Sequence, residues 1–196
     1  NGHGWTRNGM PVDLFDAALR SAPQDQDAVV DPPNREALIG GTPRRLTFRQ
    51  VADLADGYAL RLRELGLGRD DVLITQLPNV VEYVAVYLAA MRLGIVVSPV
   101  PMQYRRHELA EIVALTGARA TLTVKHLKGV EHAAGAVQLA AERPLQVLCL
   151  GSDAPPGALP FEPAPLNDAS RAALRAHVDA LGVDADDLVT ICWTSG

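Results

Sequence analysis

Aromatic residues and lysines are scarce in this chain of 196 residues. Phe, Trp and Tyr together make up 5% of it, and Lys125 and Lys128 are its two lysines. The arginines are scattered along the chain rather than clustered, and the formal net charge is −5. A nucleic-acid-binding surface normally needs a basic patch with aromatic side chains between the charges. We therefore expect no nucleic-acid partner.

Cysteines and long apolar runs are scarce as well. Cys149 and Cys192 each lie in an apolar run typical of a strand, where a reduced, unreactive cysteine is the usual finding. The chain shows no disulfide framework and no metal-ligand spacing, so no metal ligands are predicted. Its most apolar stretch, 80–91, contains Glu82 and is too short to span a bilayer. The sequence starts at Asn1 rather than at a methionine, and it shows no secretory signal. We therefore expect a soluble, cytoplasmic protein.

Five apolar runs rich in β-branched residues recur along the chain, and helical patterns separate most of them. They predict strands at 72–77, 95–100, 119–124, 145–150 and 188–193. Strands that alternate with helices are typical of an α/β fold with mainly parallel sheets and helices on the faces. The continuous apolarity of the runs indicates burial of both faces of each strand.

Start signals mark the helices between these strands. Thr47 and Gln50 form the pattern of a capping box at the start of a helix. Gly57 lies inside that helix and lowers its stability by about 1 kcal/mol relative to alanine. Asn79 is placed to cap a second helix, 80–93, which is apolar nearly all round and is therefore expected between layers. Further helices are predicted at 106–115, 130–142 and 169–181.

The segment 153–168 differs in composition from the rest of the chain. Its prolines are Pro155, Pro156, Pro160, Pro163 and Pro165. Such a density predicts a surface loop without regular structure. The segment is either a candidate subdomain boundary or a long loop inside one domain.

The common nucleotide and nucleophile motifs are missing. No G-x-G-x-x-G, G-x-x-x-x-G-K-[ST] or G-x-S-x-G is present, which disfavours dehydrogenases, ordinary P-loop proteins and α/β-hydrolases. Of the histidines, His126 follows a predicted strand and is a minor site candidate, whereas His132 is expected on a helix surface.

The remaining feature is a run of small residues, Thr194, Ser195 and Gly196, directly after the last predicted strand. Small residues after a buried strand let backbone N–H groups and hydroxyls surround phosphate oxygens. On these residues alone, an ordinary turn after a strand is the favoured interpretation.

The order of segments resembles the adenylate-forming superfamily of acyl-CoA synthetases, aryl-acid ligases, luciferases and peptide-synthetase adenylation domains. The run "LTFRQVADLADGYALRLRELGLGRDDVLITQLPNVVEYVAVYLAAMRLGIVVSPVPMQYRRHEL" is similar to the family's opening region. The run "DLVTICWTSG" is similar to the approach to the family's signature loop, which continues as Thr-Thr-Gly-x-Pro-Lys. The resemblance implies that 1–196 is part of the large N-terminal domain, that it ends inside the signature loop, and that the C-terminal domain is absent.

The resemblance also implies a function. Enzymes of this kind join a carboxylic acid to AMP and then transfer the acyl group to a thiol, most often that of CoA. By match of motif position, Thr194, Ser195 and Gly196 would bind the ATP phosphates. The magnesium ligand and the catalytic lysine would lie outside this sequence, so we assign no catalytic residue and expect the chain alone to be inactive.

Arg105 and Arg106 open a predicted helix, a position that favours anions. The resemblance makes them candidates for the nucleotide end of CoA, and two solvated arginines are the alternative. Alternatives for the whole function are an aryl-acid ligase that loads a carrier protein, and a non-catalytic doubly wound nucleotide-binding or interaction domain. The expected partners are a carboxylic acid, ATP with Mg²⁺, CoA and the remainder of the same enzyme, and a homodimer is left open.

Overall fold

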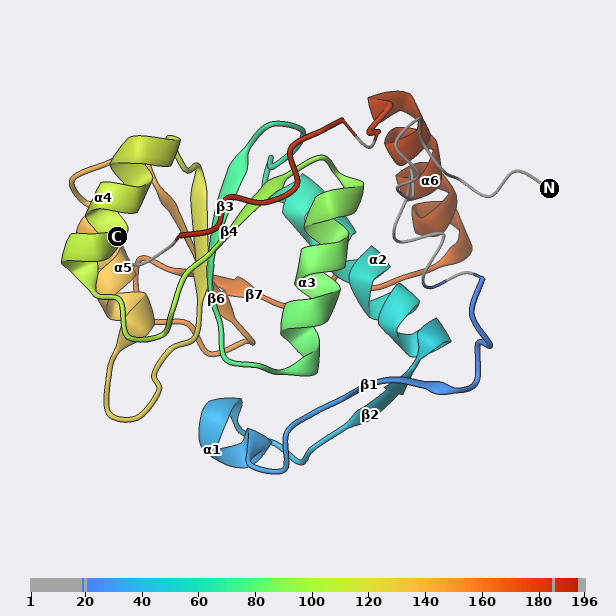
Figure 1. The fold of residues 1–196 in the computed structure, drawn as a ribbon, viewed down its shortest axis with the longest axis horizontal. Helices are drawn as coiled ribbons and strands as arrows, with labels where there is room; N and C mark the ends of the chain where they lie inside the picture. The colour runs from blue at the N-terminus through green and yellow to red at the C-terminus, as the bar shows by residue number, and fades with distance from the viewer. Residues whose placement is uncertain (1–18, 20, 185, 194–196) are drawn as a thin grey trace.

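The main sheet of the protein has five parallel strands in the order β4-β3-β5-β6-β7 (Figure 1). The computed structural model describes residue 19 and residues 21–184 and 186–193. The strands are β3 (Val72–Gln76), β4 (Val96–Pro99), β5 (Ala120–Thr123), β6 (Gln146–Leu150) and β7 (Leu159–Phe161). Four of them lie inside predicted strand ranges, which confirms the predicted α/β fold with a parallel sheet.

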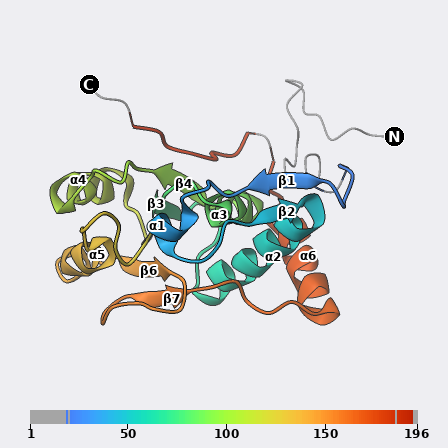
Figure 2. The ribbon, with the colours of Figure 1, turned by 90° about the horizontal axis from the view of Figure 1, so that it is seen from below.

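Helices cover both faces of this sheet (Figures 1 and 2). On one face lie α4 (Arg106–Thr116) and α5 (His132–Ala140). On the other lie α2 (Phe48–Glu64) and α3 (Val81–Arg92), and α6 (Asp168–Leu181) packs farther from the sheet. All five helices were expected from periodicity, and the bounds of α3 to α6 agree with the predicted ranges to within a few residues.

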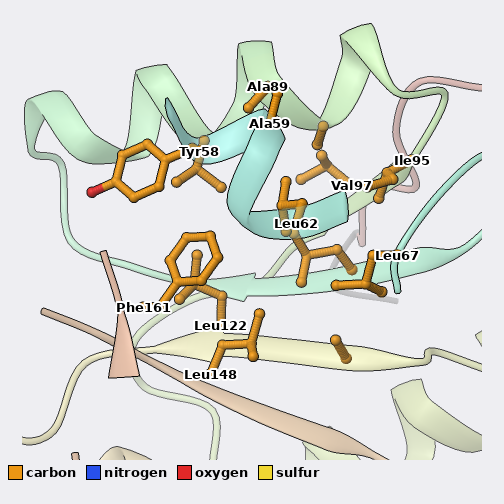
Figure 3. Packing of buried hydrophobic residues seen from close by; sticks show 14 of the residues in the cluster. Tyr58, Ala59, Leu62, Leu67, Ala89, Ile95, Val97, Leu122, Leu148 and Phe161 are labelled. Carbon is orange, nitrogen blue, oxygen red and sulfur yellow. The ribbon is translucent and has the colours of Figure 1, made fainter. Parts of the chain in front are cut away.

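The largest apolar cluster lies between the sheet and the helices α2 and α3 (Figure 3). In it Tyr58 of α2 stacks on Phe161 of β7, with ring centroids 5.2 Å apart and ring planes 9° from parallel. A second cluster separates the sheet from α4 and α5 and includes Ile74, Ile112 and Leu139. Strands β3 to β6 are thus buried on both faces, which agrees with their continuous apolarity.

The two predicted helix starts had different outcomes. The capping box before α2 is confirmed, because Thr47 Oγ1 accepts from Gln50 N–H at 3.3 Å and Gln50 Oε1 accepts from Thr47 N–H at 2.9 Å. The predicted cap at Asn79 is wrong. Helix α3 starts after Val80, and the Val81 N–H group donates to Asp31 Oδ1 at 2.9 Å. A carboxylate remote in sequence therefore replaces a local cap.

The proline-rich segment 153–168 is not free of regular structure. Strand β7 forms within it at the edge of the sheet, where Pro160 is tolerated because an edge strand needs fewer N–H donors. The same segment explains Gly57 in α2. A Cβ atom at Gly57 would lie 2.8 Å from Pro163 Cβ, and Ala164 N–H donates to Gly57 O at 3.0 Å. The glycine that disfavours the helix locally therefore permits close packing; a subdomain boundary in this segment stays a prediction.

Three elements near the N-terminus were not predicted from the sequence. Strands β1 (Asp27–Val30) and β2 (Arg45–Thr47) form an antiparallel pair, and α1 (Arg35–Ile39) lies in the connection between them. Within the described ranges, no helix has the length and apolarity needed to cross a bilayer.

Candidate functional site at the carboxyl edge of the sheet

The segment 189–193 lies along the outer edge of β4. Val97 N–H donates to Val189 O and Ile191 N–H donates to Val97 O, both at 3.0 Å. Thr190 forms a single parallel bridge with Val97, and its Oγ1 donates to Val97 O at 2.8 Å. The predicted buried strand at 188–193 is wrong in extent and burial, because one bridge replaces a strand and Leu188 is 59% exposed. The segment nevertheless runs parallel to β4, toward the carboxyl edge of the sheet.

Trp193 is the last described residue before the predicted phosphate-binding residues. Its Nε1–H group donates to Ser98 Oγ of β4 at 2.8 Å, and its ring packs against the cluster on the α4 face. Thr194, Ser195 and Gly196 lie outside the described residues. Cys192, expected in a buried strand, is exposed, whereas Cys149 in β6 is buried as expected. Burial raises the pKa of the Cys149 thiol to about 11.

The sheet order places a topological switch point at β3. Helix α3 follows β3 on one face, whereas α4 and α5 follow β4 and β5 on the other face. In open α/β sheets, ligands bind outside the carboxyl ends of the strands at such a point. The carboxyl edge near β3, β4 and β5 is therefore the candidate site.

A buried polar cluster fixes the loops at this edge. Gln76 Nε2 donates to the carbonyl oxygens of Pro101 and Tyr104, both at 3.0 Å, and Gln76 Oε1 lies 3.3 Å from His132 Nδ1. Because both amide protons of Gln76 are used, Oε1 accepts and His132 Nδ1 carries the proton. The prediction of His132 on a helix surface is wrong: it is 6% exposed. Burial, with the nearby Arg105 charge, lowers the pKa of His132, so its ring is neutral at neutral pH.

The two arginines at the start of α4 have intramolecular partners. Arg105 Nη1 donates to Met102 O at 2.8 Å and to Tyr104 O at 3.0 Å. Arg106 forms an exposed ion pair with Glu142, which follows α5. Any phosphate at this position competes with two carbonyl oxygens for Arg105 and with a carboxylate for Arg106.

A cavity of about 400 Å³ opens beside the carboxyl ends of β5 and β6. Helix α1 forms one wall, and residues 124–126 and 150–153 form the other. His126, the minor site candidate, lies in this wall beside Lys125, whose Nζ is 2.7 Å from Asp153 Oδ2. The α1 wall was not predicted, because no periodicity marks a helix of five residues.

An ion cluster holds α1 in this position; we define it as Asp31, Arg35, Arg44 and Glu82, of which all but Arg44 are buried. Arg35 Nη2 donates to Glu82 Oε1 at 2.7 Å, and Arg35 Nη1 lies 3.0 Å from Asp31 Oδ2. Arg44 also pairs with Glu82. Burial alone would raise the pKa of Asp31, but the N–H groups of Val81 and Arg44 and the charge of Arg35 hold it below its usual value.

Sequence reasoning missed Gln76, Ser98 and the ion cluster. Gln76 did carry a signal, since a polar side chain in an apolar strand must find partners when it is buried. Ser98 and Asp31 carried none, because their partners lie 95 and 50 residues away.

Comparison with known proteins assigns the chain to a family. The family model described as AMP-binding enzyme matches residues 25–196. A 2-hydroxy-7-methoxy-5-methyl-1-naphthoate–CoA ligase of Streptomyces carzinostaticus is 33% identical over 170 residues, which cover 84% of this chain and 30% of the relative. A salicylyl-CoA synthase / salicylate adenylyltransferase of a Streptomyces species is 33% identical over 166 residues, covering 82% of the chain and 29% of the relative.

Solved structures show the same fold. An anthranilate CoA ligase in complex with anthranoyl-AMP has a TM-score of 0.69 at 17% identity, covering 97% of this chain and 34% of that one. The Brucella canis acyl-CoA synthetase has a TM-score of 0.67 at 22% identity, covering 94% of this chain and 32% of that one. The chain spans 30% and 29% of the two curated relatives. With a family model matched over 25–196, the chain belongs to the family of AMP-binding enzymes.

Proposed function

We propose that this chain is the N-terminal part of an ATP-dependent ligase that activates a carboxylic acid as its acyl-adenylate and then forms a thioester with CoA. The observation that carries the proposal is the segment 189–193, which is bonded to β4 and runs toward the carboxyl edge of the sheet. The next residue in the sequence is Thr194, the first of three small residues suited to phosphate. Membership of the AMP-binding family supports the same reaction.

The proposed reaction has two steps. A carboxylate oxygen attacks the α-phosphorus of ATP, and the bond to pyrophosphate breaks. The sulfur of a thiolate then attacks the acyl carbon, and AMP leaves with the bonding electrons. In the first step charge accumulates on the phosphate oxygens, so donors fixed near them accelerate it. We propose that Thr194, Ser195 and Gly196 supply such donors through hydroxyl and backbone N–H groups.

Magnesium is expected with ATP, but the described residues do not form a site for it. No group of three or more His, Cys, Asp or Glu side chains gathers in the described ranges. We propose that its protein ligands belong to the part of the enzyme outside this chain. A cytoplasmic location also stays a prediction, which cell fractionation can test.

For the acid, we propose an aromatic carboxylate. The two relatives compared above are named for a hydroxynaphthoate and for salicylate, and further relatives are 4-coumarate–CoA ligases at 32% identity. A human long-chain fatty acid transport protein is 29% identical over 178 residues, so fatty acids belong in the test as the competing class. Transfer to a carrier protein in place of CoA is the second acceptor to compare.

The test is ATP–pyrophosphate exchange by the full-length enzyme with salicylate, 4-coumarate, anthranilate and fatty acids. Thr194→Ala removes one proposed donor, and losing a donor of this kind commonly lowers the rate by about 10²–10³-fold. Neighbouring hydroxyl and backbone N–H donors of the same run can compensate in part, so we expect the lower end of that range. Unchanged exchange in a Thr194→Ala enzyme with the normal melting temperature would reject the phosphate role.

The CoA proposal for Arg105 and Arg106 needs a separate measurement. If Arg106 binds a CoA phosphate, Glu142 competes with the ligand for it, so Glu142→Gln should lower the KM for CoA and Arg106→Ala should raise it. Neither change should affect ATP–pyrophosphate exchange, which precedes CoA binding. A KM for CoA equal to that of the unaltered enzyme in both variants would show that Arg106 pairs with Glu142 only and binds no CoA phosphate.

A further inference from the structure

The backbone pairing between β4 and the segment 189–193 stops at Val97 for a chemical reason. In a parallel pair, every second residue of a strand directs its N–H and C=O groups to the same neighbour. Val97 bonds to Val189 and Ile191 in this way. The next residue of β4 with that direction is Pro99, which has no N–H group to donate. Strand β4 therefore has no backbone donor for the carbonyl oxygen of Ile191, the next acceptor along the segment.

A side-chain hydrogen bond joins the segment to β4 beyond this point. Trp193 Nε1 can only donate, so Ser98 Oγ accepts from it at 2.8 Å. Ser98 is fully buried in β4, and the half-buried ring of Trp193 packs against the apolar cluster on the α4 face. One end of the bond is thus fixed in the sheet, and the other belongs to the residue that precedes Thr194.

We propose that Ser98 and Trp193 are a positioning pair, which sets the direction in which the chain enters the phosphate-binding residues and thereby affects ATP binding. This inference rests on the proposed function. Neither side chain needs to touch the nucleotide. The bond restricts the conformations of residue 193, and a restricted residue loses less conformational freedom when the residues after it bind the phosphates. The expected effect is therefore on ATP and not on the acid.

The test is a double-mutant cycle in the full-length enzyme. Trp193→Phe keeps an aromatic ring and removes the N–H donor, whereas Ser98→Ala removes the acceptor. We expect each change to raise the KM for ATP about three- to tenfold, the equivalent of one neutral hydrogen bond. The double variant should be no worse than the single ones, because both remove the same bond. The KM for the acid should stay within twofold of the unaltered enzyme.

Thr121→Val is the matched control. Thr121 lies in β5, is 2% exposed, and its Oγ1 has no hydrogen-bond partner in the described part of the chain. This substitution also removes a buried hydroxyl from a strand of the same sheet, but it breaks no bond, so the KM for ATP should not change. If Ser98→Ala fails to fold, Trp193→Phe carries the test alone, because it removes the donor and keeps an aromatic ring at a half-buried position.

The possible results separate this inference from the proposed function. Equal rises in the KM for ATP and for the acid, multiplicative effects in the double variant, or an unchanged KM for ATP in Trp193→Phe would overturn the positioning role and leave the proposed function intact. An unaltered enzyme that shows no ATP–pyrophosphate exchange with any acid would overturn both.

Discussion

Replacing Arg35 by methionine tests whether the ion cluster holds α1 against the sheet. Arg35 lies between two carboxylates, and the exposed fraction of the side chain is 9% for Arg35, 0% for Asp31 and 10% for Glu82. Methionine fills much of the same volume but leaves both carboxylates with Arg44, whose side chain is 38% exposed. Removing one partner of a buried ion pair costs about 3–5 kcal/mol, because an uncompensated charge remains buried.

The expected loss can be measured as a shift in melting temperature of the full-length enzyme. Each kcal/mol lowers the melting temperature by about 2–4 °C for a domain of 150–250 residues and by less for a larger one, so the predicted shift in the full-length enzyme is at most roughly 20 °C. Neutralising the carboxylates as well, with Asp31→Asn and Glu82→Gln, should recover part of it. Asn at position 31 keeps an oxygen that can accept from the N–H group of Val81.

The same hairpin offers a matched control for this prediction. Arg45 pairs with Asp27 at 2.8 Å, but their side chains are 69% and 50% exposed. Arg45→Met should therefore cost only about 0–1 kcal/mol. Equal shifts for Arg35→Met and Arg45→Met would refute the reasoning, because burial would then make no difference to the cost of losing the arginine.

Three further predictions concern stability and reactivity. Gly57→Ala should lower the melting temperature, because the new Cβ would lie 3.0 Å or less from a proline atom and a backbone atom. Gly135→Ala, where nothing lies within 4 Å of the new Cβ, should increase the free energy of unfolding by up to about 1 kcal/mol and so raise the melting temperature. A lower melting temperature for Gly135→Ala than for Gly57→Ala would contradict the packing. The pKa of Asp31 is below its usual value, so the stability that its charge contributes is present above about pH 4 and is lost as the pH falls through the native pKa. The melting temperature of Asp31→Asn should therefore fall less steeply with decreasing pH than that of the unaltered enzyme. Identical pH profiles of the melting temperature would contradict this contribution of Asp31. At pH 8 a thiol reagent should modify exposed Cys192 before Cys149, whose pKa is about 11, and mass spectrometry of the labelled peptides would reveal any reversed order.

The elements predicted from the sequence are those whose signals are local. Apolar runs and helical periodicity identified β3 to β6 and α2 to α6, because each pattern lies inside the element that it predicts. The elements that were missed depend on distant partners. Helix α1 has five residues and no periodicity of its own, and it is held by a salt bridge between Arg35 and Glu82, 47 residues apart. No local pattern could indicate that contact.

The candidate site shows the same division, and Pro99 shows why. In an open parallel sheet, ligands bind at the carboxyl ends of the strands, so the general place of the site follows from the predicted strands. The sequence at 188–193 also resembles a buried strand, yet it pairs through one bridge only. The neighbour decides this outcome: Pro99 removes the next donor from β4, and Ser98 supplies an acceptor for Trp193 instead. An apolar run indicates that a segment can form a strand, whereas the backbone donors and acceptors of the adjacent strand determine how far the pairing extends. Where that partner lies 95 residues away, only the folded chain brings the two together.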